Sequence, residues 1–280
     1  MERPANVEQP FFAYGIFRPG QLGFFQLKEF VREITVPSEI AGTLLLRDGL
    51  PIIDPNGQGH VKGALLRFAG TRAAEEAYDR ISALEPDNHY YWKEARANGQ
   101  SANVLFGRFP GKGSVHCEQD EWNGWDDPLL SSALDVVDET IQSQRLFAWD
   151  LKPLFRLQMA YVLLWSAIER YGSLRYHFGD EATGKLKHLA LEAAFGVGLS
   201  GNVAERRELY RADRPGQKVV LDPQSPQKSL EYYYQVRSNI THRGKGVVRD
   251  HDLVLKSAVE LLSIFRGVLD AARADAQMNT

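Results

Sequence analysis

The stretch YYYQVRSNITHRGKG, residues 232–246, decides how the C-terminal half of the chain is interpreted. Apolar spacing from Leu230 to His242 predicts a helix, and Gly244 and Gly246 predict its end. The stretch gathers arginine, asparagine, histidine and lysine side chains around that helix end. These residue types suit phosphodiester cleavage, because an imidazole exchanges protons near neutral pH and a guanidinium binds a phosphate. No metal ion or other cofactor is needed for this chemistry.

Arg237 and His242 are the candidate catalytic residues of this stretch, with Asn239 as a polar helper and Arg243 and Lys245 as substrate-binding cations. Five residues along an ideal helix turn by about 500°, so the arginine and histidine side chains point roughly 140° apart. They converge if the helix bends or if a second copy of the segment faces the first. The alternative interpretation is an ordinary helix C-terminus, whose cationic side chains bind the last backbone carbonyls.

The residues around this stretch have the apolar spacing of a helical bundle. Helices are predicted around Leu130–Ile141, over Leu154–Tyr171, over Gly184–Phe195, over Leu230–His242 and after an Asp250 or Asp252 cap. Gly196 and Gly198 are predicted to end the third helix, and Pro215–Lys228, with three prolines, is predicted to be an exposed loop. The C-terminal half is therefore expected to be all-α.

Residues 128–272 resemble the HEPN superfamily, a compact helical bundle with an Arg-x4–6-His motif late in the domain. Arg237 and His242 match that motif, and the following His-Arg-Gly and the terminal apolar helix also fit it. Ser238 departs from the Asn, Asp or His that often follows the arginine in the family. The resemblance implies a homodimer in which both motifs meet at the interface, and metal-independent RNA cleavage. Some family members bind nucleotides or RNA without cutting.

Other charged residues in this half have less specific interpretations. Glu169, in the helix over residues 154–171, is predicted to be a solvated charge, with orientation of the site as the alternative. Acidic residues interrupt a run of cations, so an ordinary charged surface is as good an interpretation as an RNA-facing stripe. The cations of this run are Arg206, Arg207, Arg211, Arg214 and Lys218.

The N-terminal half has the pattern of mixed strands and a helix. Strands are predicted at Phe11–Gly15, Ile40–Leu46 and Val61–Phe68, a helix at Thr71–Leu84, and a closing strand pair on either side of Asn98-Gly99, Tyr90–Ala97 and Ala102–Phe109. Residues 113–127 lack periodicity and are predicted to be a linker in which Trp122 and Trp125 dock on a domain. The expected domains are therefore 1–112, a linker at 113–127, and 128–280.

A loop and a carboxyl group are the candidate site of the N-terminal half. The loop Tyr14-Gly15-Ile16-Phe17-Arg18 leaves a strand and turns, so its backbone N–H groups are able to hold a substrate carboxylate. Glu85 precedes an aromatic run, and apolar surroundings raise the pKa of a carboxyl group so that it shuttles protons near neutral pH. The alternative is that Glu85 ends a helix or lies on the surface.

Residues 10–110 resemble the gamma-glutamylcyclotransferase-like fold, a small domain with a mixed β-barrel and a helix. Tyr14, Gly15 and Arg18 match its Tyr-Gly-(Ser/Thr)-Leu-Arg loop, and Glu85 matches its catalytic glutamate. The resemblance implies that Glu85 moves a proton from a gamma-glutamyl amine to the leaving amine, with release of 5-oxoproline. Ile16-Phe17 is bulkier than the family's small residue and leucine, and Ser82 and Pro86 replace its Asp and Gly.

Composition limits the class of protein. With 280 residues, 44% hydrophobic and 25% charged, the chain has the make-up of an ordinary globular protein of two domains. Its net charge of −3 argues against bulk nucleic-acid binding, so RNA contact requires a local patch. The single cysteine, Cys117, fits a reducing compartment, the N-terminus lacks a secretory signal, and the apolar run Met159–Ile168 is half the ~20 residues of a membrane span. A cytoplasmic protein is expected.

The sequence thus predicts an α+β protein whose main function is HEPN-type RNA cleavage, as a toxin or defence effector. The expected partners are RNA, a second copy of the chain through the helical domain, an antitoxin protein, and a small ligand in the N-terminal domain that senses or regulates. No membrane partner is expected. One alternative is a gamma-glutamyl-amine cyclotransferase with a helical dimerisation module. Another is a non-catalytic nucleotide- or RNA-binding regulator.

Overall fold

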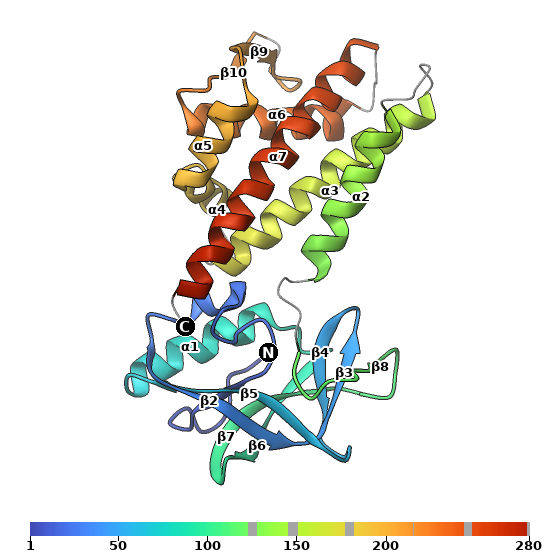
Figure 1. Cartoon of the computed structure of the whole chain (residues 1–280). Coiled ribbons are helices and arrows are strands. Elements are labelled where there is room, and N and C mark those ends of the chain that lie inside the picture. Colours follow the sequence, from blue (N-terminus) through green and yellow to red (C-terminus); the bar gives the residue numbers. More distant parts are fainter. Residues whose placement is uncertain (123–127, 145–150, 177–181, 215, 244–247, 279–280) are drawn as a thin grey trace. The chain divides into compact units, whose positions relative to one another are not determined.

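The computed structural model is a mixed α+β structure, with its larger sheets in the N-terminal half and long helices in the C-terminal half (Figure 1). It describes residues 1–122, 128–144, 151–176, 182–214, 216–243 and 248–278; the side chains at 182, 183, 185, 242, 243 and 248–250 lie outside the described part. Two compact units form: Met1–Leu129 with Leu174–His177 and Arg273–Thr280, and Leu130–Ser173 with Phe178–Ala272. None of the described helices is long and apolar enough to cross a membrane.

A five-stranded sheet is the centre of the first unit, in the order β2-β5-β1-β7-β6. Its strands are β1 (Phe11–Ala13), β2 (Val31–Ala41), β5 (His60–Phe68), β6 (Tyr90–Ala97) and β7 (Gln100–Gly107). The fully buried β1 pairs antiparallel with β5 and parallel with β7. A second sheet, β4-β3-β8, contains β3 (Thr43–Arg47), β4 (Leu50–Asp54) and β8 (Val115–His116). The described strands of this unit therefore form two open sheets. The predicted closed barrel is wrong for these strands.

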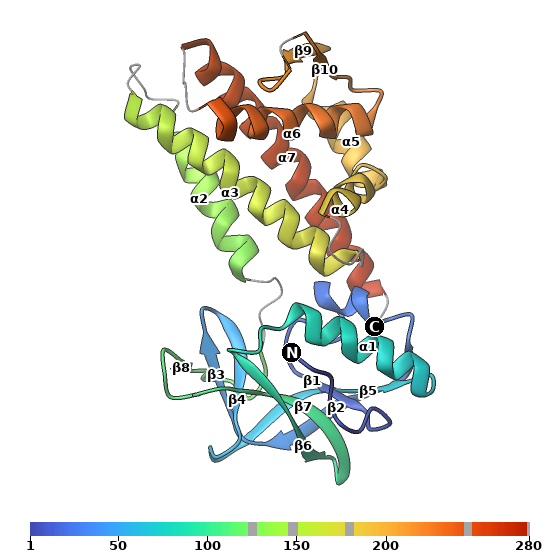
Figure 2. The ribbon, with the colours of Figure 1, turned by 180° about the vertical axis from the view of Figure 1, so that it is seen from behind.

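Helix α1 (Thr71–Leu84) packs on the five-stranded sheet because its buried residues recur at helical spacing (Figure 2). Ala74, Ala77, Tyr78 and Ile81 form that face. The Tyr78 ring lies 5.3 Å from the ring of Trp92 and 6.3 Å from that of Phe11, in edge-to-face contacts. One turn of 3-10 helix, Leu22–Gln26, completes the regular elements of this unit.

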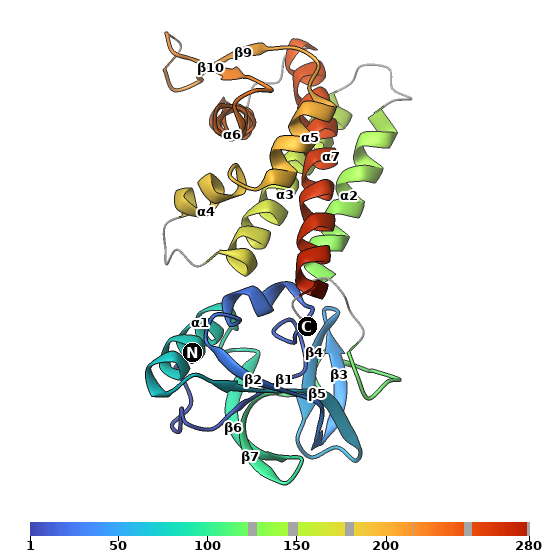
Figure 3. The same ribbon diagram turned by 60° about the vertical axis from the view of Figure 1, so that its left-hand side comes forward.

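The second unit contains six helices and a hairpin within its described residues. The helices are α2 (Pro128–Gln144), α3 (Leu151–Arg175), α4 (Ala182–Leu189), α5 (Ala193–Asn202), α6 (Pro226–Arg243) and α7 (Val248–Met278), and the hairpin is β9 (Arg207–Tyr210) with β10 (Lys218–Leu221). Helices α2, α3 and α7 run side by side in each view. Figure 3, which looks along α6, places the hairpin on one side of that helix and α4 on the other. Buried aromatic rings, among them Tyr161, Trp165 and Phe265, fill the core.

Several predicted elements are confirmed. Helix α1 has the predicted ends, and β6 and β7 form the predicted strand pair around Asn98-Gly99. Both turn residues have positive φ, 48° and 83°, as a two-residue hairpin of this type requires. Trp122 is 3% exposed and therefore docks as predicted, whereas Trp125 lies outside the described residues.

Three features of the strands were not predicted from the sequence. The run Ile40–Leu46 is divided between β2 and β3 at Gly42, whose φ of 145° suits glycine. Asp48-Gly49, with φ of 53° and 79°, turns the chain from β3 into β4 in a tight hairpin. The predicted linker contributes β8, in which Val115 and His116 pair with β3.

Two predictions about the helical half are also wrong. Gly196 and Gly198 lie inside α5, where a Cβ on Gly198 would stand 3.2 Å from Ile264 Cα, so this glycine permits close packing on α7. The segment from Pro215 to Lys228 is not simply a loop. It contains β10, with Val219 and Leu221 buried, and the start of α6 at Pro226. Proline suits a first helical position because no N–H is needed there.

Candidate functional site

Arg237 is held on α6 by two neighbours. Its Nη2 lies 3.5 Å from Glu169 Oε1 on α3, and its Nη1 donates to the Tyr234 hydroxyl at 3.3 Å. The guanidinium also lies 5.4 Å from the centre of the Tyr234 ring. With 29% of its side chain exposed, Arg237 keeps access to solvent while its direction is fixed. Such an arginine is suited to binding an anion, because its guanidinium reaches solvent and the carboxylate beside it, that of Glu169, is itself 41% exposed and weakens its charge little.

The histidine of the motif has a defined place in the helix. Helix α6 continues through Arg243, so Arg237 and His242 lie on the same helix and the rotation of about 140° between them applies. The side chains of His242 and Arg243, and the whole of Lys245, lie outside the described residues. A single copy of α6 therefore provides the motif in order, with the backbone positions of Arg237 and His242 on different faces of a regular helix.

Asn239 has a different set of contacts from those expected of a catalytic helper. Its Oδ1 accepts hydrogen bonds from the Ala212 backbone N–H at 2.8 Å and from Gln235 Nε2 at 2.9 Å. Its Nδ2 donates to the Tyr210 carbonyl at 2.9 Å. Both ends of the amide thus bind α6 to the loop that follows β9. In this arrangement Asn239 positions the hairpin against the helix.

The cation run of residues 206–218 does not form an open stripe. Arg207 turns inward and makes two hydrogen bonds to the buried Glu260 of α7. Arg211 pairs with Asp213, and Lys218 pairs with Glu208 at 2.7 Å. Hydrogen bonds raise the pKa of Arg211 and of Lys218, as expected for paired cations. The ordinary charged surface is therefore the better interpretation of this run.

The N-terminal loop begins at Tyr14, which is buried at the end of β1. Its hydroxyl donates to the Leu105 carbonyl at 2.7 Å. Burial raises the pKa of the Tyr14 hydroxyl well above its usual value, and the neighbouring Tyr90 and Glu85 add to the rise. Tyr14 therefore stays protonated in neutral and moderately alkaline solution, and it lies within electrostatic range of Glu85.

The rest of the loop is a tight turn with apolar side chains packed inward. The Arg18 N–H donates to the Gly15 carbonyl at 3.0 Å. Ile16 is 6% exposed and Phe17 is 3% exposed, so these two fill the core. A Cβ on Gly15 would stand 2.9 Å from Pro51 Cγ, which explains the glycine. The Arg18 guanidinium donates a hydrogen bond to the Glu121 carboxylate. It would have to leave this partner, or share it, to bind a substrate.

Glu85 follows the last residue of α1. Its backbone N–H donates to the Ile81 carbonyl at 3.0 Å, and its side chain is partly exposed. The aromatic run after it begins β6, where Tyr90 donates to the Pro51 carbonyl at 3.1 Å. Glu85 therefore stands at a helix end, which is one of the alternatives that the sequence left open, and its charge acts on the buried Tyr14.

Two site contacts were not predicted from the sequence. Tyr234 has no role in the sequence-based prediction, although its spacing of three residues from Arg237 places both on one helix face. Glu121 lies in the segment predicted as a linker, and nothing local indicates that it meets Arg18. The described residues contain no group of three or more His, Cys, Asp or Glu side chains placed to bind a metal ion.

The fold and these residues define a mixed α+β protein with one candidate site in each unit. No family model, no curated protein and no solved structure matches the chain. The chemistry of the residues themselves is therefore what indicates a function.

Proposed function

We propose that the protein is a metal-independent RNA endonuclease of the HEPN type that acts in the cytoplasm as a toxin or defence effector. The observation that carries the proposal is the state of Arg237. It is partly exposed, directed by Glu169 and Tyr234, and followed by His242 in the same helix. A guanidinium and an imidazole that meet at one phosphate supply both the phosphate contact and the proton transfer that RNA cleavage needs.

The proposed reaction uses the ribose 2′-hydroxyl of the substrate as the nucleophile. Its oxygen attacks the adjacent phosphorus while the bond from phosphorus to the 5′-oxygen breaks. His242 exchanges the protons: one leaves the 2′-hydroxyl and one reaches the departing 5′-oxygen. Arg237 binds the non-bridging oxygens, on which negative charge grows. The products are a 2′,3′-cyclic phosphate and a free 5′-hydroxyl.

A homodimer is part of this proposal. Since Arg237 and His242 diverge on one helix, two copies of α6 that face each other would combine the arginine of one chain with the histidine of the other. The proposed dimerisation surface is the face of the helical unit that contains α6. An antitoxin protein that covers this surface, and a small ligand in the N-terminal unit that senses or regulates, complete the proposed set of partners.

The test is incubation of the full chain with total RNA in the presence of a chelator of divalent metal ions. The expected result is a set of fragments that carry 2′,3′-cyclic phosphate ends. The variant Arg206→Ala removes an exposed cation of the same unit outside the motif and is expected to cut as the wild type does. Intact RNA across a range of substrates and protein concentrations would contradict the proposal, and RNA binding without products would favour a non-catalytic regulator.

A second candidate function, gamma-glutamyl-amine cyclotransferase, is supported by the proximity of Glu85 to Tyr14. The two come from segments far apart in the sequence, yet the charge of Glu85 contributes to the raised pKa of Tyr14. In this reaction the substrate amine nitrogen attacks the gamma-carbonyl, Glu85 moves the proton, and the leaving amine departs with it. The packing of Ile16 and Phe17 limits the space for a substrate, which is why RNA cleavage is proposed first.

Release of 5-oxoproline from a panel of gamma-glutamyl amines tests this second function. Glu85→Gln keeps the size of the side chain and removes the titrating group, so it is expected to lower product formation roughly tenfold or more. Glu75→Gln, at a partly exposed position on α1, the helix that precedes Glu85, is the control and is expected to be as active as the wild type. Equal rates for wild type and Glu85→Gln would exclude this role of Glu85.

A further inference from the structure

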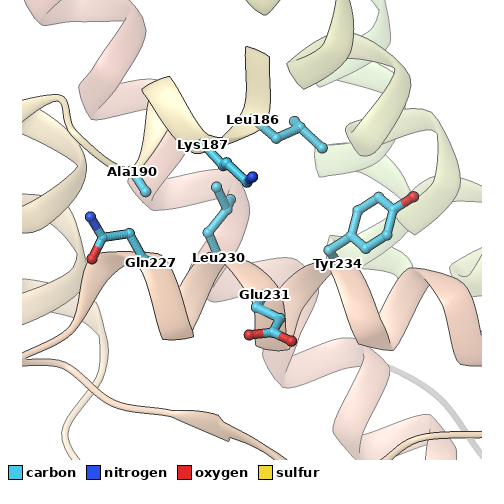
Figure 4. A pocket seen from close by; sticks show the side chains of 7 residues that line it. All are labelled: Leu186, Lys187, Ala190, Gln227, Leu230, Glu231 and Tyr234. Carbon is cyan, nitrogen blue, oxygen red and sulfur yellow. The ribbon is translucent and has the colours of Figure 1, made fainter. Parts of the chain in front are cut away.

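A cavity of about 360 Å³ lies between α4 and α6 in the helical unit (Figure 4). Its volume is within the range of small-molecule sites, roughly 300–1,000 Å³. The surface that lines it is predominantly apolar. Its lining side chains are Leu186, Lys187, Ala190, Gln227, Leu230, Glu231 and Tyr234. A cavity of this kind favours a guest with an apolar body, because little polar surface is available to replace hydration.

Lys187 gives the cavity a charge at its edge. In Figure 4 its ammonium group lies beside Leu230, whereas the carboxylate of Glu231, which also lines the cavity, points away from Lys187. The charge of Glu231 acts on Arg211 of the hairpin, which agrees with that direction. Among the residues that the structure describes, Lys187 has no ion-pair partner. An anionic group on the guest would therefore find a cation next to the apolar space.

Tyr234 connects this cavity with Arg237. Its ring lines the cavity and meets the Trp165 ring edge to face at 5.4 Å. Its hydroxyl accepts the hydrogen bond from Arg237 Nη1, and the guanidinium lies over the same ring. A guest that packs against the Tyr234 ring therefore changes the surroundings of the Arg237 guanidinium without touching it.

We infer that the cavity between α4 and α6 is a binding site for a small amphipathic anion, an acyl chain with a terminal carboxylate being the simplest form. The chain fills the space beside Leu186, Leu230 and Tyr234, and the carboxylate binds Lys187. Occupancy is passed to Arg237 through the Tyr234 ring and hydroxyl. The site is independent of whether Arg237 takes part in RNA cleavage, so each can fail without the other.

The probe is decanoate, titrated calorimetrically into the full chain below the concentration at which it forms micelles. Saturable one-site binding with Kd below about 1 mM is expected. Lys187→Glu should weaken binding about tenfold, since it reverses an exposed charge without changing the core. Decyltrimethylammonium, with the same chain and a cationic head, should bind at least about tenfold more weakly than decanoate.

Two tryptophan variants locate the probe. Gln227→Trp places a large ring at the exposed edge of the cavity and is expected to abolish binding. Lys228→Trp, one residue further along α6 and outside the lining, should bind decanoate as the wild type does. Absence of saturable binding, equal binding by Gln227→Trp, or displacement of decanoate by adenosine monophosphate would each overturn the assignment.

The link to Arg237 has its own readout. The nuclear magnetic resonance signal of the Arg237 Nε–H group, identified with Arg237→Lys, is expected to shift when decanoate binds. Tyr234→Phe keeps the ring on the cavity wall and removes the hydroxyl contact, so at saturating decanoate it should reduce that shift. A shift of equal size in Tyr234→Phe, or none in the wild type, would contradict the link while leaving the binding result to stand.

Discussion

Replacing His242 by alanine is expected to lower RNA cleavage by about 10²–10⁴-fold, the usual contribution of general acid–base catalysis. Arg237→Ala should cause a loss of similar size, because removal of a group that binds the growing phosphate charge costs about 10²–10³-fold. Arg237→Lys keeps the charge but loses the planar fork, so it should recover part of the activity. Initial rates on a defined single-stranded RNA measure all three variants.

Mixing two inactive variants distinguishes a site shared by two chains from a site within one chain. If Arg237 of one chain works with His242 of the other, a mixed dimer of Arg237→Ala and His242→Ala contains one intact site. Half of the dimers in an equal mixture are mixed, so about one quarter of the wild-type activity should return. If each chain uses its own pair, the mixture stays inactive.

The controls make either outcome interpretable. Arg206→Ala should leave the rate unchanged, and equal thermal unfolding of all variants should show that folding is preserved. If His242→Ala cleaved RNA at the wild-type rate, the motif would not be catalytic. Strictly monomeric protein at assay concentration, together with full activity, would exclude the shared site while leaving the cleavage reaction intact.

The elements that the sequence predicts well are those governed by neighbouring residues. Helix α1 follows from its buried face of Ala74, Ala77, Tyr78 and Ile81, and the β6–β7 hairpin follows from Asn98-Gly99, whose turn needs two positive φ angles. In both cases the deciding interactions lie within a few residues. Periodicity and turn chemistry are then enough to place the element.

The elements that the sequence predicts poorly depend on distant partners. Gly198 reads as a helix end, yet it lies within α5 because Ile264 of α7 packs against it. The sequence around Val219 and Leu221 predicts a proline-rich loop. In the structure, both residues belong to β10, which pairs with β9, and both are buried. No local pattern encodes these contacts, since they exist only when the unit is assembled.

The same distinction applies to the candidate sites. The order of Arg237 and His242 in one helix is visible in the sequence, and α6 contains both. What directs Arg237 is not visible, because Glu169 belongs to a different helix and had been predicted to be a solvated charge. Asn239 shows the reverse case: its residue type suits a catalytic helper, but three hydrogen bonds to the hairpin loop and to α6 occupy its amide.

The interaction with the largest expected effect on stability is the buried pair of Arg207 and Glu260. The side chain of Glu260 is 8% exposed and that of Arg207 is 16% exposed. Tyr233 donates a further hydrogen bond to Glu260 at 3.0 Å, and Tyr161 donates to the Tyr233 carbonyl at 2.9 Å. Burial lowers the pKa of Arg207, but the hydrogen bonds and charge of Glu260 outweigh this and raise it. The pair therefore connects β9, α6 and α7.

Glu260→Ala is expected to lower the free energy of unfolding of the helical unit by about 3–5 kcal/mol, because it leaves the Arg207 charge buried without its partner. Arg207→Ala should lower the free energy of unfolding by a similar amount, because it leaves the carboxylate of Glu260 buried without its partner. Replacing both residues by methionine removes the two charges together, so the double variant should be much more stable than the sum of the single losses predicts. Denaturation in urea, followed by far-ultraviolet circular dichroism, measures each value.

The exposed pair of Glu208 and Lys218 is the comparison, since it also begins on β9 but joins that strand to β10 at the surface. Solvent screens its charges, so Glu208→Ala is expected to leave the urea midpoint essentially unchanged. Equal losses for Glu208→Ala and Glu260→Ala would contradict the assignment of stability to the buried pair. Additive losses in the double methionine variant would show that Arg207 and Glu260 act on the helical unit independently. A non-additive result would establish that the two charges stabilise the helical unit as a pair.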